Sequence, residues 1–208
     1  MSTIIQGSQE WFAQRLGRVT ASRLVDVLTK LKTGEAAARA NYRAELVAER
    51  LTGKAAESFS NAAMKWGTDC EPLARAAYEA EFGVLVDEVG MIPHPAIEWT
   101  GASPDGLVGP DGLLEIKCPS TKTHIDTLLS GNAPSQYIPQ MMWQMACTGR
   151  AWVDFVSFDP RLPADMQMFV KRVHRDNDLI AAHEQEVILF LSEVGDTILR
   201  LTQLRKAA

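Results

Sequence analysis

The stretch from Gly101 to Pro119, GASPDGLVGPDGLLEIKCP, decides how the middle of this 208-residue chain folds. It holds two Pro-Asp-Gly triplets, which begin at Pro104 and Pro110 and are typical of tight turns. The apolar run that follows, over 112–118, predicts a strand. A turn centred on Pro110 and Asp111 would fold the chain back on itself as a hairpin.

This hairpin is expected to gather charged side chains at one end of a sheet. Glu115 and Lys117 are two residues apart in the strand, so both side chains leave the same face. Antiparallel pairing about the turn places Asp105 opposite roughly Ile116, beside Glu115. Two carboxylates and one ammonium group would therefore converge.

Two converging carboxylates suit a hard divalent cation such as Mg²⁺, which also takes backbone carbonyls and several waters. We expect Asp105 and Glu115 to hold the ion, and the carbonyl of Ile116 to add an oxygen. The ion would bind a phosphate oxygen, lower the pKa of a bound water and stabilise the leaving oxygen. Lys117 would orient that water or counter the charge of the pentavalent state. The spacing alone is weak evidence, because turn aspartates and Glu-x-Lys pairs on solvated strands are common.

Composition and the order of expected elements predict one mixed domain over 1–208. The chain is 46% hydrophobic and 23% charged, which is typical of a globular protein able to bury one sizeable core. Helices are expected over the first 83 residues, followed by a small sheet, helices, two strands and a long helix. This order predicts an α+β or mixed α/β fold rather than a regular βαβ array.

Several of these elements have recognisable ends. Ser8 is expected to cap a short helix that ends near Gly17, and Thr20 to cap a second with an apolar stripe from Leu24 to Leu31. The other helices are expected over 36–52, from Ser60 to Gly83, over 125–129 and 135–148, and from 176 onward, with further strands at 84–93, 97–102, 151–158 and 166–174.

Some protein classes are excluded. No apolar run approaches the roughly 20 residues needed to cross a bilayer, and the N-terminus lacks the basic and apolar stretches of a secretory signal. The three cysteines (Cys70, Cys118 and Cys147) contain no CxxC pair, which disfavours a disulfide framework and a zinc ribbon. We therefore expect a cytoplasmic protein. The net charge of −5 excludes a uniformly basic nucleic-acid coat but not a local basic groove.

Five segments of the chain together resemble the phage lambda-type alkaline exonucleases, a viral recombinase family of the PD-(D/E)xK nuclease superfamily. Five matches in the family's order are far more specific than the carboxylate spacing alone. Two positions depart from the pattern: Met142 replaces a second glutamine, and Lys122 stands one position before a family arginine. The matching segments are WFAQRLGRVTAS at 11–22, WGTDCEPLAR at 66–75, SPDG with GLLEIKCP within 103–119, YIPQMMWQM at 137–145 and FVSFDPR at 155–161.

The resemblance implies a restriction-endonuclease-like core, in which helices flank a central mixed sheet. It also implies one or two Mg²⁺ ions in each active site, with Mn²⁺ as a substitute. The site residues carried over are the metal-binding Asp105, Glu115 and Ile116 carbonyl, the catalytic Lys117, the supporting acid Glu71, which would also bind metal, and the polar Gln140.

The resemblance further implies residues that handle the end of DNA. Arg15 matches an arginine that receives the 5′ phosphate, and a guanidinium fork gives phosphate a charge-assisted bidentate contact. Ser22 and Ser103 match hydroxyl residues near that phosphate, and Met64 matches an apolar wedge that separates the terminal base pair. A capping serine, a turn serine and a core methionine are the alternative interpretations of these three.

The implied function is a Mg²⁺-dependent 5′→3′ exonuclease acting on linear double-stranded DNA with a 5′ phosphate. The family forms homotrimeric rings and works with a single-strand annealing protein in phage-type recombination, in the cytoplasm of a bacterial host, from a phage or prophage. Two alternatives remain open. An endonuclease of the same fold would cut covalently closed circles, and a non-catalytic DNA-binding recruitment module would keep its function after Lys117→Ala.

Overall fold

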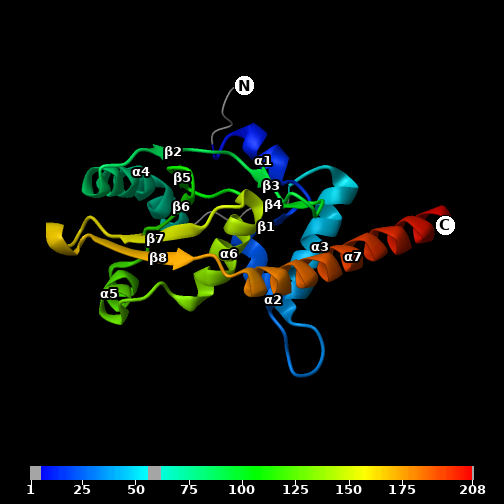
Figure 1. Ribbon diagram of the computed structural model, residues 1–208. Coiled ribbons are helices and arrows are strands. Elements are labelled where there is room, and N and C mark those ends of the chain that lie inside the picture. Colours follow the sequence, from blue (N-terminus) through cyan, green and yellow to red (C-terminus); the bar gives the residue numbers. More distant parts are fainter. Residues whose placement is uncertain (1–5, 56–61, 208) are drawn as a thin grey trace.

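The computed structural model describes residues 6–55 and 62–207, and in them helices pack around two sheets (Figure 1). The larger sheet has five strands in the order β2-β5-β6-β7-β8, and the smaller has three in the order β1-β4-β3. Strand β6 pairs antiparallel with β5 and parallel with β7. The expected mixed α/β class, with mixed sheets flanked by helices, is confirmed.

The strands are β1 (Val19–Thr20), β2 (Val86–Asp87), β3 (Ile92–Pro93), β4 (Thr100–Ala102), β5 (Gly106–Val108), β6 (Gly112–Lys117), β7 (Trp152–Phe158) and β8 (Met168–His174). The α-helices are α1 (Gln9–Arg15), α2 (Leu24–Leu28), α3 (Ala37–Thr52), α4 (Ala62–Phe82), α5 (Thr121–Ser130), α6 (Ile138–Thr148) and α7 (Asn177–Ala207). Short 3-10 turns lie at Ala21–Arg23, Ser135–Tyr137 and Ala164–Met166.

Strand β6 lies at the centre of the larger sheet and is buried on both faces. Leu113 belongs to the same core cluster as Trp143 of α6, whereas Leu114 belongs to a second cluster with Tyr78 of α4. Side chains alternate along a strand, so Glu115 follows Leu113 onto the face that α6 covers. A carboxylate thus stands where the fold would otherwise place an apolar residue.

Several helix ends follow the sequence as expected. The Ser8 hydroxyl accepts a bond from the backbone N–H of Trp11 and caps α1. Helix α3 ends at Gly53, whose φ of 67° closes the helix in the left-handed conformation that glycine favours. The long helix α7 runs beside α3 (Figure 1). Glu193 of α7 forms ion pairs with Arg39 and Arg43 of α3.

The expectation that Thr20 caps a helix is wrong. Thr20 lies in β1, which pairs in parallel with β4 through Val19 and Thr100, and its side chain makes no capping bond. Helix α2 covers only Leu24–Leu28, and Leu31 is exposed. Pairing with a strand some eighty positions away therefore overrides the local capping signal.

The strand expected at 84–93 is in fact two short strands in different sheets. Strand β2 pairs with β5, whereas β3 pairs with β4. The strand expected at 97–102 shortens to β4, because Trp99 before it has a φ of 62° and is not extended. The expected helix start at Ser60 lies outside the described residues.

None of the helices within residues 6–55 and 62–207 combines the length and the apolar character needed to cross a membrane.

A buried network ties α4 to the larger sheet. Asp154 of β7 accepts hydrogen bonds from the Tyr78 hydroxyl at 2.7 Å and from Nε and Nη2 of Arg172, both at 2.8 Å. Burial, and then the bond to Asp154, raise the pKa of Tyr78. The tyrosine therefore keeps its proton and remains a donor to the buried carboxylate.

Replacing Tyr78 by Phe removes one donor from this carboxylate. We expect the free energy of unfolding to fall by about 1.5–3 kcal/mol, as for other hydrogen bonds to charged groups. Urea denaturation measures this, and Glu81→Gln, an exposed change on the same helix, should cost no more than about 0.5 kcal/mol. Equal values for the two variants would show that the hydroxyl bond adds nothing.

Candidate active site

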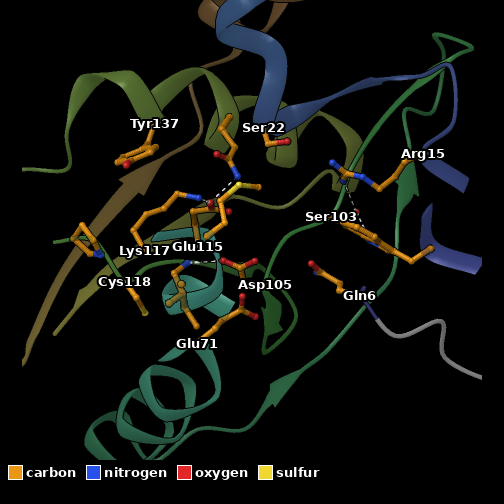
Figure 2. Close-up of a pocket in the computed structure, with 16 residues that line it drawn as sticks. Gln6, Arg15, Ser22, Glu71, Ser103, Asp105, Glu115, Lys117, Cys118 and Tyr137 are labelled. Carbon is orange, nitrogen blue, oxygen red and sulfur yellow. Dashed lines mark hydrogen bonds and ion pairs between the residues drawn. The ribbon is translucent and has the colours of Figure 1, made fainter. Parts of the chain in front are cut away.

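A cavity of about 460 Å³ opens where β6 ends (Figure 2). Figure 2 shows Lys117, Glu115 and Asp105 in its middle, with Glu71 on one side and Arg15 and Ser103 on another. All ten residues singled out from the sequence line this one cavity: Arg15, Ser22, Met64, Glu71, Ser103, Asp105, Glu115, Ile116, Lys117 and Gln140. Six others join them: Gln6, Trp11, Gly67, Cys118, Pro119 and Tyr137.

The β5–β6 hairpin delivers Asp105 to this cavity, with a register one residue away from the expected one. Gly106 pairs with Leu114, so Asp105 stands opposite Glu115 rather than Ile116. The loop has three residues and is centred on Pro110, which accounts for the shift. The Asp105 backbone N–H donates to the Leu114 carbonyl at 3.1 Å, and its Oδ2 accepts from the Ile116 N–H at 2.6 Å.

Three donors surround the fully buried carboxylate of Glu115. Gln140 donates to Oε1 at 2.6 Å, and Gln144 donates to Oε2 at 2.5 Å. Lys117 forms an ion pair with Oε1. Both glutamines come from α6, which covers this face of β6, so the packing of one helix supplies two of the three donors.

The charge on Lys117 is fixed by its neighbours. Burial by itself lowers the pKa of this ammonium group, but Glu115 and Asp105 outweigh burial and raise the pKa above its usual value. These neighbours therefore favour the protonated ammonium form of Lys117. The Tyr137 ring lies 5.1 Å from its Nζ and adds a cation–π contact.

The carboxylates repel one another and are short of positive charge. Burial, and then the charge of Glu115, raise the pKa of Asp105 well above its usual value, although Lys117 opposes this. Burial likewise raises the pKa of Glu71, with Arg75 opposing and Glu115 adding to it. A further cation would relieve this repulsion.

The chemistry of the donors fits Mg²⁺. All the candidate ligands are hard oxygens, namely the carboxylates of Asp105, Glu115 and Glu71 and the Ile116 carbonyl. In the described part of the chain, no three His, Cys, Asp or Glu side chains form a group that could by itself hold a metal ion. An ion here would bind the carboxylates of Asp105 and Glu115 and several waters, as Mg²⁺ prefers.

Arg75, which the sequence did not single out, holds Glu71 and the hairpin together. Its Nη2 donates to Glu71 Oε1 at 2.8 Å and to the Asp105 carbonyl at 3.2 Å. It also forms an ion pair with Glu88 at 2.8 Å. The i,i+4 spacing of Glu71 and Arg75 on α4 was the available signal, but the bond to Asp105 depends on packing.

The other end of the cavity is suited to an anion. Arg15 Nη1 lies 3.4 Å from the Ser103 hydroxyl, which also accepts from Trp11 Nε1 at 3.0 Å. The Arg15 guanidinium stacks 4.1 Å from the Trp11 ring centroid. Burial lowers the pKa of Arg15, yet a guanidinium stays charged in proteins. The Ser22 hydroxyl lies 3.4 Å from that of Thr20 and faces the same cavity.

Met64 lies in α4 at the cavity, and its side chain is 55% exposed. This exposure contradicts the alternative interpretation, in which Met64 packs in the core. An apolar side chain in this position suits contact with a bound molecule, and the wedge role stays a prediction.

The sequence also missed Gln144, which lies on the same face of α6 as Gln140. Residues four apart share a helix face, whereas position 142 points elsewhere: Met142 is buried in the main core cluster. The departure from the family pattern at Met142 therefore leaves the bonds to Glu115 intact. The i,i+4 spacing of the two glutamines could have revealed Gln144.

Comparisons with known proteins agree with this architecture. Residues 10–151 match the model of the YqaJ-like viral recombinase domain. An alkaline exonuclease (LHK-Exo) from Laribacter hongkongensis is 55% identical with a TM-score of 0.90, and the match covers 97% of this chain and 100% of that one. Its complex with dAMP is 56% identical with a TM-score of 0.91, over the same shares.

A more distant likeness concerns the fold alone. A phage-related exonuclease from Haemophilus somnus 129PT is 16% identical with a TM-score of 0.68, over 88% of this chain and 96% of that one. No curated protein matches the chain. The family model spans more than half of the chain, and the Laribacter enzyme is similar along nearly all of it; this chain belongs to the YqaJ-like viral recombinase family.

Proposed function

We propose that this protein is a Mg²⁺-dependent 5′→3′ exonuclease that degrades one strand of linear double-stranded DNA to mononucleotides and leaves 3′ single strands. One observation carries the proposal: a single cavity joins the cluster of Asp105, Glu115 and Lys117 to the Arg15–Ser103 pair. A site for a terminal phosphate beside a hydrolytic centre has a use only at an open DNA end.

The relatives support this reading. LHK-Exo is an alkaline exonuclease, and its structure with dAMP holds a mononucleotide, the kind of product proposed here. At 55% identity over almost the whole of both chains, a shared reaction class is the simplest expectation.

In the proposed mechanism the groups of the cavity divide the work of binding the ion and stabilising the charge on the phosphate. Asp105, Glu115 and the Ile116 carbonyl would hold Mg²⁺, with Glu71 as the supporting acid, and the ion when bound supplies Lewis-acid polarisation of phosphate. Lys117 keeps its proton and stabilises the negative charge that develops on the phosphoryl oxygens. Gln140 keeps Glu115 in place and contacts the attacking water or a phosphate.

The remaining residues would set which phosphate is cut. Arg15 holds the 5′ phosphate through paired N–H donors, and the hydroxyls of Ser22 and Ser103 complete its surroundings. Met64 separates the terminal base pair, so that one strand enters the cavity. Holding the end phosphate fixes the next phosphodiester at the carboxylates, which yields one nucleotide per cut.

We also propose a homotrimeric ring and an annealing partner. The chain carries a net charge of −5, so uniform attraction to DNA would not retain it on the duplex. A closed ring of three subunits would retain it topologically, and a single-strand annealing protein would take up the 3′ strands.

Light scattering coupled to size exclusion tests the ring. We expect a mass three times that of one chain, independent of concentration in the micromolar range. A monomer or dimer on linear DNA that still degrades thousands of nucleotides without dissociating would contradict the topological explanation.

Lys117→Ala should leave DNA binding intact and slow strand degradation about 10²–10³-fold, because one preorganised charge on the transition state is lost. Release of acid-soluble nucleotides from 5′-phosphorylated linear duplex, with Mg²⁺ or EDTA, measures this. Lys171→Ala, an exposed change on β8, is the matched control and should match the wild type. A wild-type rate of degradation by Lys117→Ala would contradict the catalytic role assigned to Lys117.

Arg15→Ala should lower kcat/KM on 5′-phosphorylated ends by roughly 10–150-fold, since a charge-assisted hydrogen bond contributes about 1.5–3 kcal/mol. On 5′-hydroxyl ends the kcat/KM of the same variant should equal that of the wild type, so the 5′-hydroxyl substrate serves as the control. Arg15→Lys should recover part of the loss, because it restores the charge but not the fork. An equal loss on both kinds of end would show that Arg15 does not recognise the terminal phosphate.

A further inference from the structure

Helix α6 contains one buried polar side chain in an otherwise apolar run. Every residue from 141 to 147 is buried, and Gln144 is fully so. Its neighbours along the run are Met141, Met142, Trp143, Met145, Ala146 and Cys147. The packing of this segment therefore gives no reason for an amide at position 144.

The buried amide of Gln144 makes a single side-chain hydrogen bond within the described residues. Its Nε2 donates to Glu115 Oε2 at 2.5 Å, whereas its Oε1 is buried and finds no partner there. An unmet buried acceptor destabilises a fold, and a methionine of similar length would pack in this place without that cost. The residue is explained by what it does for Glu115.

The two oxygens of Glu115 are held unequally. Oε1 receives both Gln140 and Lys117, but Oε2 receives only Gln144 among the hydrogen bonds and ion pairs described. The terminal torsion of a glutamate is broad, so contacts to one oxygen leave the carboxylate plane free to turn. A donor on the second oxygen fixes that plane.

We propose that Gln144 is a positioning residue, which locks the carboxylate plane of Glu115 from the side opposite Lys117. This inference rests on the proposed function, in which Glu115 shares a cation with Asp105, and adds a residue to which the family resemblance assigned no role. Partners that orient a metal-binding carboxylate typically change affinity or activity by about 10–100-fold when lost.

Gln144→Met removes the donor and keeps the volume. We expect kcat on 5′-phosphorylated linear duplex to fall by about 10–100-fold, while KM for DNA ends stays within about twofold, because no DNA-contacting group changes. Isothermal titration with MgCl₂ alone, without DNA, should show a loss of Mg²⁺ affinity of the same order. Met145→Leu, an equally buried apolar change on the same helix, should leave all three quantities unchanged.

A thermodynamic cycle separates positioning from packing. In the Glu115→Gln background the carboxylate is absent, so Gln144→Met should change the free energy of unfolding by a different amount than in the wild type. If Gln144→Met fails to fold, Gln144→Asn decides instead: it keeps the amide but shortens its reach, and the same loss of kcat and Mg²⁺ affinity is expected.

Three results would overturn the inference. The first is wild-type kcat and Mg²⁺ affinity in a folded Gln144 variant, and the second is a rise in KM of about 10–100-fold with no change in kcat. The third is that the Gln144→Met and Glu115→Gln changes in the free energy of unfolding are fully additive in the double variant. Failure of the broader proposal looks different. In that case the wild type itself degrades no DNA, while the unfolding cycle and the Mg²⁺ titration still report on the Gln144–Glu115 pair.

Discussion

The rest of the site depends on the burial of one charge, the carboxylate of Glu115, inside the central strand of the larger sheet. A buried carboxylate is strongly destabilising unless donors and an opposite charge surround it. Gln140, Gln144 and Lys117 meet that need. Helix α6 must therefore pack against the sheet in one position, and Lys117 must follow Glu115 on the same face of the strand.

The same burial prepares the cavity for a cation. Burial raises the pKa of Asp105 and of Glu71, and the charge of Glu115 nearby raises both further. Lys117 and Arg75 together cannot balance three carboxylates that are all ionised. The imbalance faces the cavity, where a divalent ion and a phosphate would both be accommodated, and Arg15 places a further positive charge at the far end of the same space.

The sequence alone predicted the parts of the site that rest on local pattern. The hairpin follows from its turn residues, and the gathering of Asp105, Glu115 and Lys117 follows from strand alternation. The predicted register of the hairpin differs by one residue from the observed one, because the turn residues did not reveal that the loop has three residues. Thr20 was misplaced because its strand partner, Gly101, is distant in the chain. Gln144 was missed although its i,i+4 spacing from Gln140 places both on one helix face, because its bond to Glu115 depends on how α6 packs on β6.

The most direct test uses three DNA substrates with Mg²⁺ or EDTA: linear duplex labelled at the 5′ ends, the same duplex labelled at the 3′ ends, and a covalently closed circle. The account predicts that Mg²⁺ alone supports release of labelled mononucleotides from the 5′ ends, that the 3′ label stays in long single strands, and that the circle remains intact. Nicking of the circle would point to an endonuclease. Binding of linear DNA without any cleavage would leave only a recruitment module.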